Sequence, residues 1–212
     1  MTALQLADRE TVADLTTYVT RARALDTDGA IRLQASGTTL AAWVGVLRGR
    51  GITGQGTVVG LRALELAEPA EVDSVVPLPA VSDRLARIAD DDTALDVPPM
   101  TVRTSWAAVS PPRAGWHPIA EIDIKLLSTV AAEGISQIAQ GAPEGSGAVA
   151  VETLRQEVWG QAMPLTGAAD GLPAGVAFGA YALGFLTGEV AQVYTAARWF
   201  RVTTLGGHVL VR

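Results

Sequence analysis

The sequence contains no cysteine, which excludes disulfide bonds, thiolate zinc sites and thiol catalysis. Lysine is almost absent as well: Lys125 is the single lysine among 16 basic residues, and no basic run exceeds Arg48-Gly49-Arg50 in length. The net charge is −6, so the chain shows no electrostatic footprint for nucleic acid, and we expect no nucleic-acid partner. The lack of cysteine suits a reducing compartment, and we expect a cytoplasmic protein.

Charged residues are also scarce. They make up 18% of the chain, against 49% apolar residues, whereas roughly 25% of a typical soluble domain is charged. A chain with so little charge has apolar surface to cover. We therefore expect self-association through the C-terminal half, where residues 171–188 carry no charge and a terminal hairpin offers an edge for pairing.

Neither a signal peptide nor a membrane span is predicted. The N-terminal residues lack a basic stretch followed by an apolar core. Glycine and proline interrupt residues 171–188, and the apolar part is shorter than the roughly 20 residues of a spanning helix. We interpret this segment as a buried helix in which Gly175 and Gly179 allow a close approach of another backbone, and we expect no membrane partner.

Local patterns predict the elements of the first half. Residues 8–25 have helical spacing of apolar side chains behind Asp8, which can cap the helix. Ser36-Gly37 predicts a hairpin turn, Pro69 ends a strand, and Pro79 begins a short helix. The predicted strands cover residues 31–35, 40–47, 58–66 and 72–76.

The second half begins in a long loop and continues as helices. Residues 90–118 hold five of the eleven prolines and two of the five tryptophans, and a loop of this length is often functional. A helix is predicted from Pro118, a hinge over 141–147, and further helices over 151–158 and after residue 171. Residues 199–204 and 208–211 flank Gly206-Gly207 and predict a C-terminal hairpin.

These elements indicate the α+β class: an antiparallel β-sheet from the N-terminal part covered by helices, with a C-terminal β-hairpin. We expect residues 1–140 to form an α+β domain that includes the Pro/Trp loop 90–118. Residues 141–212 are expected to add a helical segment and the hairpin, packed on the same core.

Known motifs for metals, cofactors and catalysis are missing. Gly49-x-Gly51-x-x-Gly54 resembles a dinucleotide loop, but a strand follows it where that motif requires a helix. Asp90-Asp91-Asp92 is interpreted as a solvated helix end, and the two histidines have no metal-ligand spacing. We therefore expect no cofactor and no metal, and a non-enzyme more than an enzyme.

One segment combines side chains that are typical of binding sites. Residues 105–117 bring together Arg113, Trp106, Trp116 and His117 around the rigid pair Pro111-Pro112. Trp and Arg are enriched at binding hot spots, and a guanidinium near an indole can bind a carboxylate or phosphate. We expect an anionic ligand here; the alternative is a structural cover whose tryptophans only fill the core.

Three strings resemble a family of conserved hypothetical proteins from high-GC Gram-positive bacteria. They are LADRETVADL near the start, LRALELAEPAEVD at 61–73 and SPPRAGWHP at 110–118. The resemblance covers most of the chain and implies no activity and no residue roles.

Three functions follow as alternatives. The first is a non-catalytic interaction or assembly module that forms a homo-oligomer. The others are a small-molecule (anion) binding domain and an enzyme, each of which would use the loop 105–117.

Overall fold

The computed structural model describes residues 2–51, 53–142 and 147–212, which form two compact units. The first unit holds residues 1–46 and 59–110, and the second holds residues 47–58 and 111–212. Helices and antiparallel strands occur in both, so the predicted α+β class is confirmed. The main boundary falls between Ser110 and Pro111, whereas the sequence analysis set it at 140/141.

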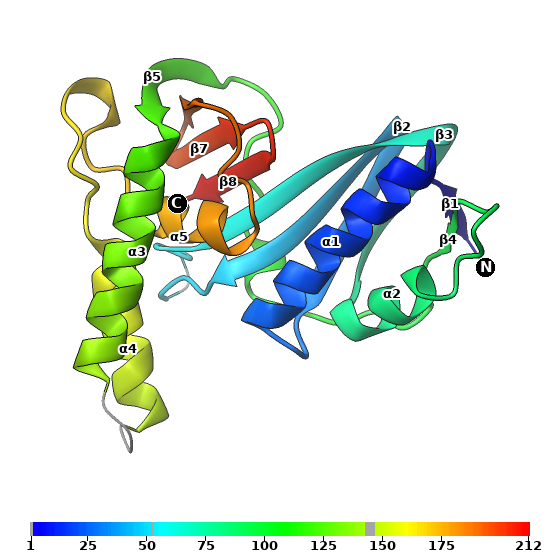
Figure 1. The fold of residues 1–212 in the computed structure, drawn as a ribbon, viewed down its shortest axis with the longest axis horizontal. Coiled ribbons are helices and arrows are strands. Elements are labelled where there is room, and N and C mark those ends of the chain that lie inside the picture. Colours follow the sequence, from blue (N-terminus) through cyan, green and yellow to red (C-terminus); the bar gives the residue numbers. More distant parts are fainter. Residues whose placement is uncertain (1, 52, 143–146) are drawn as a thin grey trace. The chain divides into compact units, whose positions relative to one another are not determined.

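Helix α1 (Arg9–Leu25) is the first long element of the first unit, and it confirms the helix predicted over 8–25. A carboxylate oxygen of Asp8 accepts a hydrogen bond from the Thr11 backbone amide at 2.8 Å, so the predicted cap is present. The apolar stripe of α1, which includes Leu15 and Tyr18, is buried. The helix runs along the strands of its own unit (Figure 1).

Strands β2 (Ala30–Leu47) and β3 (Val58–Pro77) are neighbours in a sheet, and both are longer than predicted. The turn expected at Ser36-Gly37 is wrong, because β2 continues through it; Gly37 has a φ of 58°, which glycine adopts without strain. The break expected at Pro69 is also wrong. Pro69 is exposed within β3, where a missing N–H leaves no buried group unsatisfied.

Shorter elements complete the first unit. Helix α2 (Leu78–Leu85) has Pro79 in its first turn, as predicted. Strands β1 (Ala3–Gln5) and β4 (Ala94–Asp96) pair with each other, and the 3-10 turn η1 covers Trp106–Ala108. The core consists of large apolar side chains from these elements, among them Leu4, Leu6, Leu15, Ile31, Leu33, Leu66, Leu78 and Leu95.

The second unit contains four antiparallel strands in chain order: β5 (His117–Asp123), β6 (Val190–Ala196), β7 (Trp199–Thr204) and β8 (Gly207–Val211). The predicted C-terminal hairpin is confirmed as β7–β8. It does not offer a free edge at β7, because that strand pairs with β6 and β8 on its two sides.

The helix predicted from Pro118 is wrong, because the chain first forms strand β5. Helix α3 (Ile124–Gly141) begins only after Asp123, whose carboxylate accepts a hydrogen bond from the Lys125 amide at 2.7 Å. The register of β5 on β6 shifts between Pro118 and Ala120. This irregularity accommodates a proline that sequence reasoning placed in a helix.

The helices of the second unit pack closely through glycines. Helix α4 (Ala148–Gly160) lies beside α3 (Figure 1), the turn η2 covers Gly167–Ala169, and α5 (Gly175–Ala182) is buried almost throughout. A Cβ at Gly175 would lie 3.0 Å from Leu47 and Val58, and one at Gly179 would lie 2.9 Å from Val209. Both glycines are closely packed, but the prediction of another backbone there was largely wrong: apart from the Trp159 carbonyl, 3.3 Å from a Cβ at Gly175, the nearest atoms are side chains of the same unit.

The hinge predicted over 141–147 falls largely on residues 143–146, which lie outside the described residues. Within the part of the chain that the structure describes, no helix is long and apolar enough to cross a membrane.

Candidate anion-binding pocket

A cavity of about 560 Å³ lies in the second unit. Its walls come from the loop between β2 and β3, the C-terminal part of α4, residues 171–173, the turn between β6 and β7, and the end of β8. The apolar part of the wall includes Leu47, Val58, Trp159, Phe200 and Val211. We call this cavity the arginine pocket, after its charged lining: Arg48, Arg50, Arg155, Arg198 and Arg212, with Glu152 and Glu157.

The charge of the pocket differs from that of the chain. Five of the fifteen arginines line it, together with two glutamates, which leaves an excess of three positive charges in a chain whose net charge is −6. Guanidinium groups stay charged at any ordinary pH and can hold carboxylates and phosphates through paired N–H donors. The arrangement therefore suits an anion.

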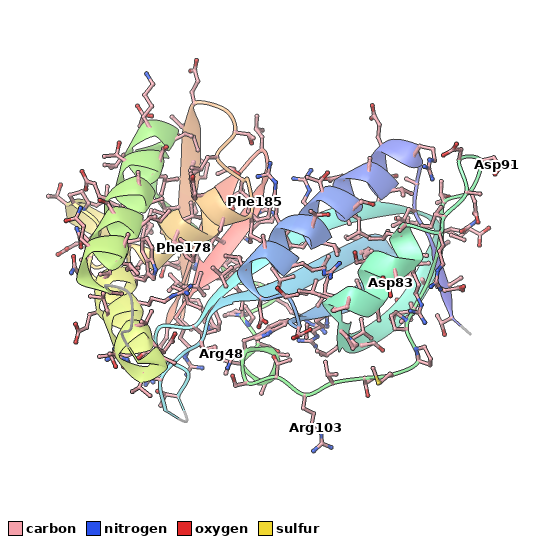
Figure 2. The ribbon with its side chains drawn as sticks, turned by 60° about the horizontal axis from the view of Figure 1, so that its bottom comes forward. Arg48, Asp83, Asp91, Arg103, Phe178 and Phe185 are labelled. Atoms are coloured by element: carbon pink, nitrogen blue, oxygen red, sulfur yellow. The ribbon has the colours of Figure 1, made fainter. Side chains whose placement is uncertain are left out.

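The loop between β2 and β3 positions two of the arginines. Arg48 directly follows the end of β2 (Figure 2). The backbone amide of Arg50 donates to the carbonyl of Gln55 at 2.7 Å, and its side-chain Nε donates to Oε1 of Gln156 at 2.5 Å. Gln156 donates in turn to Glu152 at 3.0 Å. These bonds fix Arg50 against α4.

The glycines of this loop serve a tight turn. A Cβ at Gly49 would lie 2.5 Å from the carbonyl oxygen of Gly54 and would also meet the Thr57 hydroxyl, so only glycine fits there. Strand β3 follows at Val58. The described loop residues thus connect two strands, and the dinucleotide motif requires a helix at this place.

A strained turn positions Arg198. Ala196 and Trp199 pair across β6 and β7, so Ala197 and Arg198 form a two-residue hairpin loop. Ala197 has a φ of 53°, in the left-handed region that costs a non-glycine residue about 1–3 kcal/mol. The exposed Arg198 is thereby held at the rim of the arginine pocket.

An aromatic pair supports the α4 side of the arginine pocket. The rings of Trp159 and Phe178 are stacked, with centroids 4.6 Å apart and an angle of 19° between their planes. The guanidinium carbon of Arg155 lies 6.0 Å from the centroid of Phe178, the residue of α5 that Figure 2 labels. Arg155 is thus held over Phe178, whose ring stacks on Trp159 of the pocket wall.

Trp159 also has an unused donor. It is 3% exposed, and its Nε1 atom has no hydrogen-bond partner among the described residues. The six-membered ring of this indole faces Gly134 of α3, so Nε1 lies on the edge that points away from α3. A buried indole N–H usually donates a hydrogen bond, and a buried donor without an acceptor costs about 1–3 kcal/mol of stability.

The residues predicted from the sequence are distributed over both units. Arg113 and His117 are exposed and Trp116 is half-buried, all in the second unit, while Trp106 packs against Gly45 in the first. The indole of Trp116 donates to the Pro112 carbonyl at 3.0 Å. Within the described residues none of the four lines the arginine pocket, and an anion site around Arg113 stays a prediction.

Sequence reasoning missed the arginine pocket because its arginines come from separate segments. Arg48 and Arg50 lie two positions apart in the sequence, but Arg155, Arg198 and Arg212 are far from them and from each other. No spacing rule connects them. As for metals, no group of three or more His, Asp or Glu side chains within the described ranges is placed to hold an ion.

Two family models match the chain. Residues 1–108 match the family described as Domain of unknown function (DUF8010), and residues 111–212 match Domain of unknown function (DUF8185). A comparison with curated proteins finds no match. The two matches meet where the two units meet in the chain, between residues 108 and 111.

Solved structures of bacterial sliding clamps have a similar fold. The C. crescentus beta sliding clamp matches with a TM-score of 0.53 and 12% identity, covering 100% of this chain and 65% of that one. The Pseudomonas aeruginosa clamp matches with a TM-score of 0.52 and 11% identity, covering 99% of this chain and 63% of that one. The DNA polymerase beta subunit of Streptococcus pyogenes matches with a TM-score of 0.51 and 9% identity, covering 99% of this chain and 63% of that one. The chain thus spans less than two thirds of those structures, and at this identity the likeness concerns the fold alone.

Proposed function

Since the chain belongs to the family described as Domain of unknown function (DUF8010), whose description assigns no activity, we propose a function from the arginine pocket itself. The chain is a non-catalytic protein-interaction module, and the arginine pocket binds an acidic segment of a partner protein. The gathering of five arginines around one cavity of about 560 Å³ carries this proposal.

The size and lining of the arginine pocket support a peptide segment as the ligand. Ligand cavities are typically about 300–1,000 Å³ in volume, so this one has room for a few side chains. The apolar wall with Trp159 and Phe200 can accept an apolar residue, while the arginines pair with carboxylates. A charge-assisted hydrogen bond is worth about 1.5–3 kcal/mol, so several of them give a useful affinity.

The chemistry of the lining favours binding over catalysis. Guanidinium groups do not give up protons at neutral pH, so the arginines of the arginine pocket can hold and orient an anion without acting as acids or bases. Glu152 accepts a hydrogen bond from Gln156, which in turn accepts one from Arg50. This carboxylate therefore belongs to the scaffold that fixes the arginines.

The sliding-clamp fold supports an assembly role, and we extend the proposal to self-association. The uncharged segment and the C-terminal hairpin no longer support self-association. Residues 175–180 are buried within their own unit, and β7 is paired on both sides. Strand β5, which ends the sheet order of its unit, is a better edge for pairing. The lack of cysteine supports placing this module in the cytoplasm.

The expectation of no nucleic-acid partner finds no support in the comparisons. The similar structures are DNA polymerase clamps by their own descriptions, and an arginine pocket can bind phosphates as well as carboxylates. DNA is therefore the competing ligand that an experiment must separate from an acidic peptide.

The test measures binding of a fluorescein-labelled octapeptide of alternating Glu and Leu by anisotropy, with the matching Gln–Leu peptide as the neutral control. Arg155→Ala and Arg198→Ala should each weaken the Glu–Leu complex about tenfold, through the loss of a charge-assisted hydrogen bond. Arg103→Ala is the matched control, because Arg103 is an exposed arginine of the first unit that extends away from the chain (Figure 2).

Three results would contradict the proposal. They are equal binding of the Glu and Gln peptides, no effect of the two arginine variants of the arginine pocket, and tighter binding of a 20-base-pair DNA duplex than of the peptide. The last result would assign the arginine pocket to phosphate and make nucleic acid the partner.

A further inference from the structure

Arg201 occupies the middle of β7, on the face of the sheet opposite to the arginine pocket. Side chains alternate along a strand, and its neighbour Phe200 lines the arginine pocket, so Arg201 points to the other face. Tyr194 of β6 lies directly opposite Arg201 in the register, and Leu210 of β8 lies on its other side.

Two aromatic rings hold the guanidinium of Arg201. Its central carbon lies 4.7 Å from the ring centroid of Trp116 and 4.3 Å from that of Tyr194. Trp116 is itself fixed, because its indole N–H donates to the Pro112 carbonyl at 3.0 Å. Cation–π contacts of this kind stabilise a guanidinium in a single orientation.

This guanidinium is partly dehydrated, and the part of the chain that the structure describes offers it no acidic partner. Its Nε atom is buried without an acceptor, and the side chain as a whole is half-buried. Burial lowers the pKa of Arg201 below its ordinary value, with Tyr194 acting in the opposite direction. Among the described residues no carboxylate forms an ion pair with it, and Glu121 on the same sheet accepts its hydrogen bond from Gln192 at 2.7 Å.

We propose that Arg201, held between Trp116 and Tyr194, is an anchor for a single carboxylate side chain of a partner protein. A carboxylate that takes two N–H groups of a guanidinium lies in the same plane. Such a carboxylate can approach the guanidinium without leaving its plane, beside the rings of Trp116 and Tyr194, whereas the tetrahedral oxygens of a phosphate extend out of that plane. One cation also matches the single charge of a carboxylate.

A partner side chain suits this place better than a free metabolite. Small molecules bind where a cavity covers most of their surface, roughly 70–90%, and Arg201 stands on a sheet face outside the lining of the arginine pocket. Trp, Tyr and Arg are the three residues most enriched at the hot spots of protein interfaces, and all three meet here. This site is independent of the arginine pocket, since Arg201 does not line it.

The test follows the Trp116 indole N–H signal by NMR, which is present in wild type and in Arg201→Lys. The probes are an acetylated, amidated Leu-Glu-Leu peptide, its Leu-Gln-Leu analogue, acetate and inorganic phosphate, all at constant ionic strength. We expect a saturable shift with the Glu peptide and none with the Gln peptide. Arg201→Lys keeps the charge but loses the planar fork, and should weaken the response about tenfold. Arg103→Lys should leave it unchanged.

Five results would overturn this proposal. An unchanged titration in Arg201→Lys would show that Arg201 does not bind the probe. Equal shifts with the Gln peptide would exclude the carboxylate, and equal or stronger shifts with phosphate would assign another anion. Acetate that binds as tightly as the Glu peptide would exclude a partner side chain. A fold-only role for Arg201 predicts a lower melting temperature in Arg201→Lys with no titration in wild type.

Discussion

Gly134 of α3 is the residue whose replacement tests the packing of the second unit most directly. An alanine Cβ at this position would lie 2.5 Å from Cη2 of Trp159 and closer still to Cζ3. Carbon atoms in contact are normally about 3.5–4.0 Å apart. The indole cannot easily move, because Phe178 stacks on it at 4.6 Å and α5 is buried behind that ring.

The magnitude follows from two opposing effects. Overpacking of a tight core costs about 1–3 kcal/mol, and an overlap of more than 1 Å with a rigid ring belongs at the upper end. Alanine gains about 1 kcal/mol over glycine in a helix interior. We therefore expect Gly134→Ala to lower the free energy of unfolding by about 2 kcal/mol, or the melting temperature by about 4–8 °C.

The measurement is urea and thermal unfolding followed by Trp fluorescence and circular dichroism. Gly160→Ala, in the helix that carries Trp159, is the matched control, because a Cβ there meets nothing within 4 Å. It should be neutral or slightly stabilising. If Gly134→Ala is as stable as this control, the close contact between α3 and α4 is not as the structure shows it.

Two further predictions concern the loop of the arginine pocket and the core of the first unit. Gly49→Ala should lower the free energy of unfolding by about 2 kcal/mol and weaken binding of the acidic peptide, because the Cβ would lie 2.5 Å from the Gly54 carbonyl oxygen. An unchanged free energy of unfolding together with unchanged peptide affinity would contradict this. Burial raises the pKa of Tyr18 well above its ordinary value of 10.0. Above about pH 10 the unfolded chain therefore releases a proton that the folded chain keeps, so the free energy of unfolding should fall with rising pH. Tyr18→Phe should remove this part of the fall, which urea titrations between about pH 8 and 11 would measure.

The elements that the sequence predicted correctly are those with local causes. Helix α1 follows from a capping residue at Asp8 and an apolar stripe that any helix of this sequence would bury. The β7–β8 hairpin follows from strand-forming residues around Gly206-Gly207. In each case the residues that determine the element lie within it.

The errors arose where a distant partner overrides a local signal. Ser36-Gly37 has turn composition, yet its hydroxyl and amide both donate to Glu71 of β3 at 3.1 Å, so the pairing keeps the strand continuous. Pro118 is typical of a helix start, yet pairing of β5 with β6 places it in a strand. Sequence spacing contains no information about these partners.

The identity of the residues in the binding site also depends on distant partners that sequence spacing does not show. The sequence analysis predicted a guanidinium near Trp116 from the local segment and named Arg113. The structure places Arg201, from a strand far along the chain, over that ring at 4.7 Å. A guanidinium beside the Trp116 ring could be predicted from the residue types, but which arginine supplies it depends on the register of the strands.

The second unit is discontinuous in the chain, and this has a consequence for synthesis. Residues 47–58 belong to it together with residues 111–212. A ribosome releases the loop with Arg48 and Arg50 well before it has made α4, whose Gln156 holds Arg50. The loop must wait for its structural partners, so the arginine pocket is among the last parts of the protein to mature. A fragment expressed from residue 111 onward would lack Leu47 and Val58, against which Gly175 packs.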